Sequence, residues 1–164
     1  MIEGAATGTD GVAEGSVVGS GVVVGAVVVA GRLGWSAAGL RLLGDGVTTG
    51  PLVDAHRRPE PPYAAGPALA AAGATAMCDV SDGLVQDAGH LARASGVAIA
   101  LESALLHDDA VELRDVLTGG EDHALVATLP GSPPPGCRVV GRVVAGEGVT
   151  VDGRAVEGGW EHFA

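Results

Sequence analysis

The chain has 164 residues, of which 47% are hydrophobic and only two Trp, one Tyr and one Phe are aromatic. This length and composition fit one domain with a core of Val, Leu and Ala. The formal net charge of −11 disfavours binding to nucleic acid, and the absence of lysine excludes a Walker-type phosphate lysine and a Schiff-base lysine.

The first part of the chain, 1–26, has no periodicity and is predicted to be disordered or divergent; a folded domain follows over 27–164. The apolar run Val17–Ala30 is short, interrupted by glycine and preceded by acidic residues, so neither a membrane span nor a signal peptide is predicted. Cys78 and Cys137 match no metal-ligand spacing and are predicted to be reduced thiols, which favours the cytoplasm.

Short β-branched runs predict strands and amphipathic runs predict helices. In chain order we expect a strand at Val27–Ala30, a helix capped by Ser36 that ends near Gly44, a connector at Gly50–Pro62, a helix at Tyr63–Ala72, a strand at Ala74–Val80, a helix at Leu84–Ala94, a strand at Val97–Leu101, a helix at Leu105–Val116, and strands at Ala124–Leu129, Val139–Val144 and Val149–Val151 with a turn at Asp152-Gly153.

Two of these helices are predicted to have polar outer faces. Gln86, Asp87 and His90 should face outward from the first. The other should carry a charged face of Asp108, Asp109, Glu112 and Asp115. Strands and helices alternate first and strands cluster later, which indicates an α+β fold with a mixed β-sheet and packed helices.

The run Asp79-Val80-Ser81-Asp82-Gly83 carries the strongest functional signal. It puts two carboxylates and a hydroxyl at a strand end and at the mouth of a helix, where ligands bind in open α/β sheets. Oxygen ligands of this kind suit Mg²⁺ and its bound phosphates. A purely structural helix N-cap is the alternative, because Ser and Asp are preferred there.

A second motif, Leu117-Thr118-Gly119-Gly120-Glu121-Asp122, delivers two more carboxylates from a Gly-Gly turn just before a strand. In this order, the two motifs resemble the C-terminal half of thiamine-monophosphate kinase, a family of the aminoimidazole-ribonucleotide-synthetase superfamily. The strand and glycine turn around Gly31, the proline-rich stretch His56–Pro61 and the tail Gly158–Phe163 also resemble that family.

The resemblance implies the superfamily's C-terminal domain fold and Mg²⁺-dependent phosphoryl transfer from ATP to thiamine monophosphate. It implies that Asp79 and Asp82 ligate Mg²⁺, that Ser81 contacts ATP, and that Glu121 and Trp160 bind thiamine phosphate. The alternative for Glu121 is a solvated loop acid. The alternative for Trp160 is a tail anchor that packs on the domain. No side chain is assigned as a catalytic base, and Asp122 and His123 receive no role. The family implies a homodimer.

The chain also departs from the family. We expect an N-terminal ATP-binding domain to be absent, an arginine near Gly19 to be missing, and Val24-Gly25-Ala26 to replace a turn before the strand at Val27. Two readings remain open beside the kinase: an inactive half-domain that packs on a partner, such as a separate N-terminal half, and another ATP-using enzyme of the superfamily.

Overall fold

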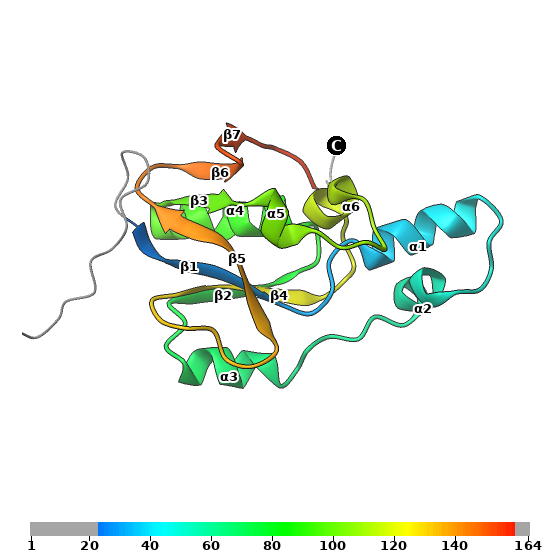
Figure 1. Cartoon of the computed structure of the whole chain (residues 1–164), viewed down its shortest axis with the longest axis horizontal. Coiled ribbons are helices and arrows are strands. Elements are labelled where there is room, and N and C mark those ends of the chain that lie inside the picture. The colour runs from blue at the N-terminus through cyan, green and yellow to red at the C-terminus, as the bar shows by residue number, and fades with distance from the viewer. Residues whose placement is uncertain (1–22, 160–164) are drawn as a thin grey trace, which may run out of the picture.

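A seven-stranded mixed sheet with helices on both faces forms the body of the protein (Figure 1). The computed structural model describes residues 23–159. The strands are β1 (Val23–Ala30), β2 (Ala76–Val80), β3 (Ala98–Leu101), β4 (Ala124–Leu129), β5 (Cys137–Val144), β6 (Gly148–Val151) and β7 (Arg154–Ala155). The helices are α1 (Trp35–Gly44), α2 (Pro51–Arg57), α3 (Ala65–Ala71), α4 (Leu84–Ser95), α5 (Ser103–Leu106) and α6 (Leu113–Thr118).

The strand order is β2-β4-β1-β5-β3-β6-β7, and every pair is antiparallel except β3 and β6. The predicted α+β fold with a mixed sheet is therefore confirmed. Register brings Val80 of β2 opposite Ala124 of β4, and Ala30 of β1 opposite Leu125. The end of β1, the end of β2 and the start of β4 consequently meet at one end of the sheet.

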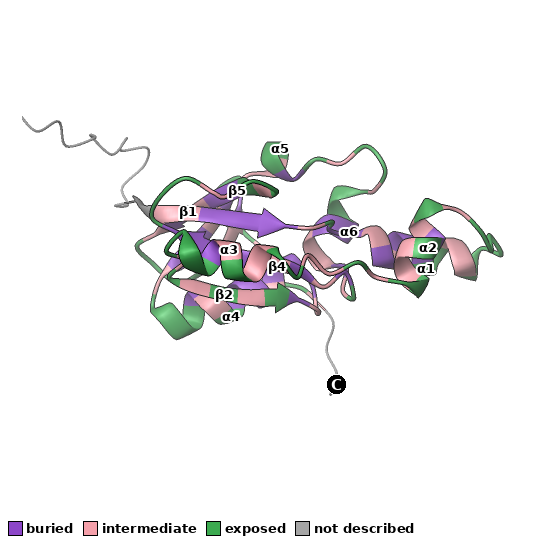
Figure 2. Ribbon diagram, turned by 90° about the horizontal axis from the view of Figure 1, so that it is seen from below, coloured by how far each residue is buried: buried purple, intermediate pink, exposed green. Residues whose placement is uncertain are grey.

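Consecutive valines of β1 pack into two core clusters, one on each face of the sheet. Successive side chains of a strand point to opposite faces. Val27 and Val29 pack with Leu84, Val85 and other residues of one cluster, under α4, and Val28 packs with Leu69 of α3 in the second. All three valines are fully buried, as expected for a central strand covered on both faces. Figure 2 shows this burial along β1.

Helices α1 and α2 form an arm that extends beyond the end of the sheet (Figure 1). The two helices pack mainly on each other. Gly39 allows this approach, because a Cβ atom there would overlap the carbonyl of Leu52. No helix of residues 23–159 is long and apolar enough to cross a bilayer.

Four predicted elements need correction. Strand β1 begins at Val23 rather than Val27, because Val23, Gly25 and Ala26 already pair with β5, and Ala26 also pairs with β4. Helix α1 begins one residue before Ser36, with Gly34 at its N-cap in a left-handed conformation (φ 80°). Ser36 is buried and does not cap the helix.

The other two corrections concern the connector predicted after the first helix and the helix predicted before the strand at Ala124–Leu129. The connector 50–62 contains α2, which starts at Pro51, since proline suits the first turn of a helix. The single helix predicted over 105–116 is instead two short helices, α5 and α6, separated by residues 107–112. Asp115 lies inside the protein, paired with Arg41 at 2.7 and 2.8 Å, rather than on a charged outer face.

Candidate functional site

The loop from Asp79 to Gly83 joins β2 to α4 and is held by a buried aspartate. The Asp87 carboxylate accepts hydrogen bonds from the backbone N–H groups of Ser81 and Asp82, both at 3.0 Å. Its residue is only 6% exposed, so the prediction that Asp87 faces outward is wrong. Burial raises the pKa of this carboxyl, and the backbone hydrogen bonds from Asp82 and Ser81 offset only part of the rise.

The second motif packs directly against this loop. The N–H of Glu121 donates to the carbonyl of Ser81 at 2.8 Å, and the N–H of His123 donates to the carbonyl of Val80 at 3.0 Å. A Cβ atom at Gly120 would overlap the Ser81 carbonyl, and one at Gly83 would lie 2.9 Å from the Thr118 carbonyl carbon. The glycines therefore let the two loops touch through their backbones.

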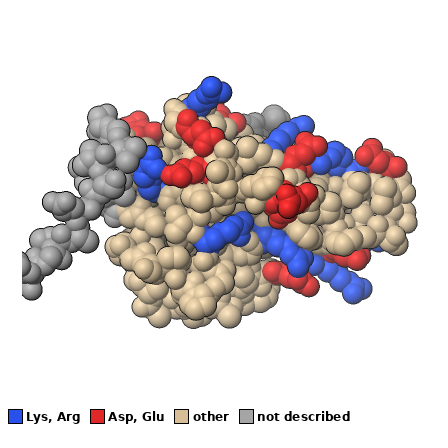
Figure 3. All heavy atoms as spheres, in the orientation of Figure 1, with Lys and Arg blue, Asp and Glu red and all other residues tan. Residues whose placement is uncertain are grey.

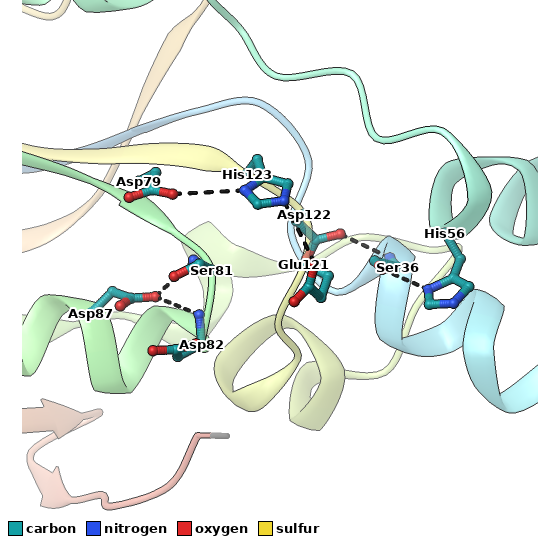
Figure 4. A network of polar contacts seen from close by, with 9 residues as sticks. All are labelled: Ser36, His56, Asp79, Ser81, Asp82, Asp87, Glu121, Asp122 and His123. Carbon is teal, nitrogen blue, oxygen red and sulfur yellow. Dashed lines mark hydrogen bonds and ion pairs between the residues drawn. The ribbon is translucent and has the colours of Figure 1, made fainter. Parts of the chain in front are cut away.

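The acidic side chains of the two loops meet at His123. Its Nδ1 lies 3.7 Å from Asp79 Oδ2 and its Nε2 lies 3.6 Å from Glu121 Oε2 (Figure 4). Glu121 and His123 both have positive φ angles, 66° and 52°, which cost roughly 1 kcal/mol or more for a residue with a side chain. That conformation turns the two side chains to positions that an extended backbone would not give.

Asp122, between them, points the other way, into the protein. Its carboxylate accepts hydrogen bonds from the N–H of Gly34 and, at 2.8 Å, from the N–H of Ser36. Burial raises the pKa of Asp122, and the bonds from Ser36 and Gly34 lower it by less. Asp122 thus fixes the second loop to the start of α1.

The polar network continues from α1 into α2. Ser36 Oγ lies 2.9 Å from His56 Nδ1, so the contacts run from the start of α4, through both loops, to the arm (Figure 4). From the sequence, Asp122 and His123 received no role, and Asp87 was wrongly predicted to face outward. The available signal for the role of Asp87 was an acidic residue in the first helical turn after Ser-Asp-Gly. The roles of Asp122 and His123 depend on the conformation of their loop.

A pocket of about 430 Å³ opens beside the acidic end of β2. Asp79 and His123 form its polar side, and Tyr63, which is 83% exposed, stands with two prolines on the other. Its lining is Pro61, Pro62, Tyr63, Gly66, Asp79, His123 and Leu125.

Both cysteines are free in the described structure. Burial raises the pKa of Cys78, on β2, to about 12, with smaller contributions from Asp87 and Asp79. The Cys78 thiol is therefore fully protonated near neutral pH and a poor nucleophile.

No family model matches the chain, but individual relatives do. The chain is 46% identical over 161 residues to the thiamine-monophosphate kinase of Mycobacterium tuberculosis and 40% identical over 159 residues to that of Corynebacterium glutamicum, covering 88% and 84% of this chain. The chain is a partial homologue of the thiamine-monophosphate kinases. It spans 48% of each of these two relatives, which is consistent with the predicted C-terminal half.

Solved structures give the same result. AaThiL complexed with AMPPCP and TMP matches with a TM-score of 0.76 and 36% identity, over 87% of this chain and 52% of that one. The hydrogenase maturation protein HypE of Escherichia coli matches with a TM-score of 0.61 at 18% identity. This second likeness concerns the fold alone.

The residues predicted for this thiamine-monophosphate kinase homologue are only partly brought together. No group of three or more His, Cys, Asp or Glu residues within 23–159 is arranged to hold a metal. Asp79 extends beside His123, whereas Asp82 lies just before the start of α4 (Figure 4). Trp160 lies outside the described residues.

Of the two predicted metal ligands, Asp79 is open to solvent. Mg²⁺ is usually bound through one or two carboxylates, with phosphate and water oxygens completing its shell. The Asp79 side chain is 59% exposed, and its contact with His123, at 3.7 Å, is longer than a hydrogen bond. Asp79 therefore remains accessible to a cation.

Proposed function

We propose that this chain forms one side of a site in which a phosphoryl group passes from ATP to thiamine monophosphate, giving thiamine diphosphate and ADP. The backbone contact between the two acidic loops carries the proposal, because it fixes Ser81 and Glu121 next to each other. It is supported by the kinship with thiamine-monophosphate kinases and by the likeness to AaThiL complexed with AMPPCP and TMP.

In this proposal the first loop serves the nucleotide. Asp79 and Asp82 hold Mg²⁺, and Ser81 contacts the phosphates of ATP. A bound Mg²⁺ neutralises charge on the phosphates and helps orient them. The buried Asp87 keeps the Ser81 and Asp82 backbone fixed while these side chains bind.

The second loop serves thiamine monophosphate. Glu121 is 67% exposed at its side chain and held by its own N–H, so its carboxylate can face the cationic thiazolium or an aminopyrimidine donor. Trp160 is proposed to stack on the same heterocycle, because an electron-rich ring attracts a cation.

No side chain need act as a strong base in this reaction. The acceptor is a phosphate oxygen that already carries negative charge, so catalysis depends on positioning and on charge neutralisation. We also propose a cytoplasmic protein that works with a further, N-terminal-type half, and dimerisation as the resemblance implies.

Binding tests the proposal without requiring turnover. Calorimetric titration with Mg²⁺ and AMPPCP should show saturable binding that Asp82→Asn weakens at least tenfold, since one metal ligand is lost. Asp109→Asn serves as the control, because Asp109 is almost fully exposed and pairs only with His107 among the described residues. Equal affinities for the parent and Asp82→Asn would contradict the proposed metal site and favour a non-catalytic packing module.

A further inference from the structure

An arginine-lined pocket lies where the arm joins the sheet, outside the acidic loops. It has a volume of about 660 Å³, within the range of small-molecule sites, and includes Arg32, Arg57 and Arg58 in its lining. These are three of the nine basic side chains in a protein of net charge −11. Figure 3 shows basic and acidic side chains interleaved around this part of the surface.

Arg32 is held in place at one wall. Its guanidinium lies over the ring of Trp35, 4.5 Å from the ring centre, and 3.8 Å from the carboxylate of Glu60. The Trp35 ring is itself fixed, because its Nε1–H donates to Asp108 at 2.9 Å. This wall is therefore ordered before any ligand arrives.

Arg57 and Arg58, at the end of α2, also line the pocket. Arg57 donates one N–H to the carbonyl of Thr48 at 2.8 Å, which leaves its other donors available. The backbone N–H of Arg58 donates to the carbonyl of Asp54 at 2.8 Å, whereas its guanidinium forms no hydrogen bond or ion pair with any residue of 23–159, and Pro59 restricts the backbone that follows it. Unpaired guanidinium donors of this kind suit the oxygens of a phosphate.

Carboxylates also border the pocket. Glu60 is paired with Arg32, and Asp54 contributes a second negative charge. Three guanidinium groups against two carboxylates leave a net positive pocket. A smaller hollow of about 140 Å³ continues towards Asp122, whose two oxygens are already engaged by the N–H groups of Gly34 and Ser36.

We propose that this pocket binds the phosphate chain of a phosphorylated ligand directly through arginine, without a metal ion. The site is distinct from the acidic loops and does not depend on the proposed kinase reaction. It provides the positive contacts that a lysine-free, strongly acidic protein otherwise lacks for a free polyanion.

The test uses inorganic pyrophosphate with EDTA present, so that no Mg²⁺ bridges the acidic loops. In a Trp160→Phe background Trp35 is the one remaining tryptophan, and its emission should change saturably as pyrophosphate binds. Arg58→Gln should weaken binding at least tenfold, because charged hydrogen bonds to phosphate are lost. The Arg58 side chain bonds to no described residue, and its backbone bond to Asp54 is kept in the variant, so the variant should fold normally.

Two matched variants sharpen the result. Asp54→Asn should tighten binding about twofold or more, since it removes a repulsive charge. Arg154→Gln, on β7 and outside the pocket lining, should leave the affinity unchanged. Calorimetry on Arg32→Gln, which also alters the surroundings of Trp35, should show the same weakening as Arg58→Gln.

Competition then identifies the source of the phosphate. Displacement of pyrophosphate by metal-free ATP would assign the pocket to a nucleotide, and displacement by thiamine monophosphate would assign it to that substrate. Displacement by neither would leave a separate phosphorylated effector as the ligand. Absence of saturable pyrophosphate binding, or equal affinities for the parent, Arg58→Gln and Arg154→Gln, would overturn the proposal.

Discussion

Buried aspartates fix both loops of the candidate site at the level of single residues. Asp87 holds the N–H groups of Ser81 and Asp82, and Asp122 holds those of Gly34 and Ser36. Backbone donors that are buried without an acceptor are costly. Each aspartate therefore stabilises the conformation of a loop in the candidate site.

Replacing Asp87 should destabilise the protein through those donors. Asp87→Ala leaves two N–H groups without their acceptor and should lower the free energy of unfolding by about 1–3 kcal/mol. Asp87→Asn retains one oxygen that can accept both bonds, so it should cost less. Urea denaturation of the two variants and the parent measures the difference. Equal loss in both would mean that charge, rather than the acceptor atom, is what matters.

Asp122 should make stability depend on pH. Its pKa is raised in the folded protein, so the folded state holds the proton more tightly than the unfolded chain. The stability that this group contributes is therefore present at acidic pH and is lost as the pH rises through its folded pKa.

The comparison with Asp122→Asn isolates this effect. From pH ~4 upward, the free energy of unfolding of the parent should fall relative to that of the variant. Denaturant titrations at several pH values measure this difference. A parent that gains stability relative to Asp122→Asn over the same range would show that the hydrogen bonds from Ser36 and Gly34 outweigh burial.

At the scale of elements, three loops converge because three strands end together. The antiparallel pairing of β1 and β2 with β4 brings the segments that follow Ala30 and Val80 and precede Ala124 to one end of the sheet. Glycines set the distances between these loops. Gly34 lies against the backbone of Asp115 and Val116, and Gly120 lies against that of Ser81.

Gly120→Ala should therefore separate the two acidic loops. Its added methyl group would overlap the Ser81 carbonyl, and relieving such a clash should cost about 1–3 kcal/mol of stability. Gly44→Ala is the matched control, because a Cβ atom there meets no atom within 4 Å and alanine favours helix. Thermal unfolding compares the two. Similar melting temperatures for both variants would show that the loop contact is more pliable than the structure indicates.

The sequence predicted correctly those elements whose apolar residues recur at the spacing of a helix or strand and whose ends are marked by glycine or turn residues. Strand β4 and helix α4 are confirmed almost to the residue, because each has a clear apolar pattern between glycines or turn residues. The break between α5 and α6 was missed. The Asp108 side chain there accepts bonds from Trp35 and from the Ala110 N–H, contacts that compete with helix and depend partly on a residue 73 positions away.

The candidate site was predictable only in part for the same reason. Residue types at a strand end and the resemblance to thiamine-monophosphate kinase suggested Asp79, Ser81 and Asp82 as candidates, and the resemblance suggested Glu121; the structure places Ser81 and Glu121 in contact through their backbones. No local pattern shows that Asp122 turns inward, because its partners Gly34 and Ser36 lie 88 and 86 positions away. For Asp87 a local signal existed, its place in the first turn of α4 directly after the loop that it binds, but a helical wheel treats such an acid as solvent-facing.

At the scale of the whole molecule, the acidic loops lie near an edge of the sheet rather than in an enclosed cavity. Strand β2 is the edge strand, with Met77 and Asp79 exposed. The chain spans about half the length of the curated relatives that it matches. Within residues 23–159 the acidic loops bring two candidate Mg²⁺ ligands, which are not part of any three-residue metal cluster.

The last prediction is that this chain alone does not turn over thiamine monophosphate at the rate of an ordinary enzyme. Phosphoryl transfer requires both anions to be positioned and neutralised at once, so part of a site should lose far more rate than its share of contacts. The assay measures thiamine diphosphate and ADP released from ATP, Mg²⁺ and thiamine monophosphate, with Asp82→Asn as the control for contaminating kinase. We expect less than ~1 s⁻¹, the lower end of typical turnover. Adding the other half of the Mycobacterium tuberculosis relative should restore product, and Asp82→Asn should abolish it. Rapid turnover by the chain alone that Asp82→Asn abolishes would show instead that its own residues complete the site.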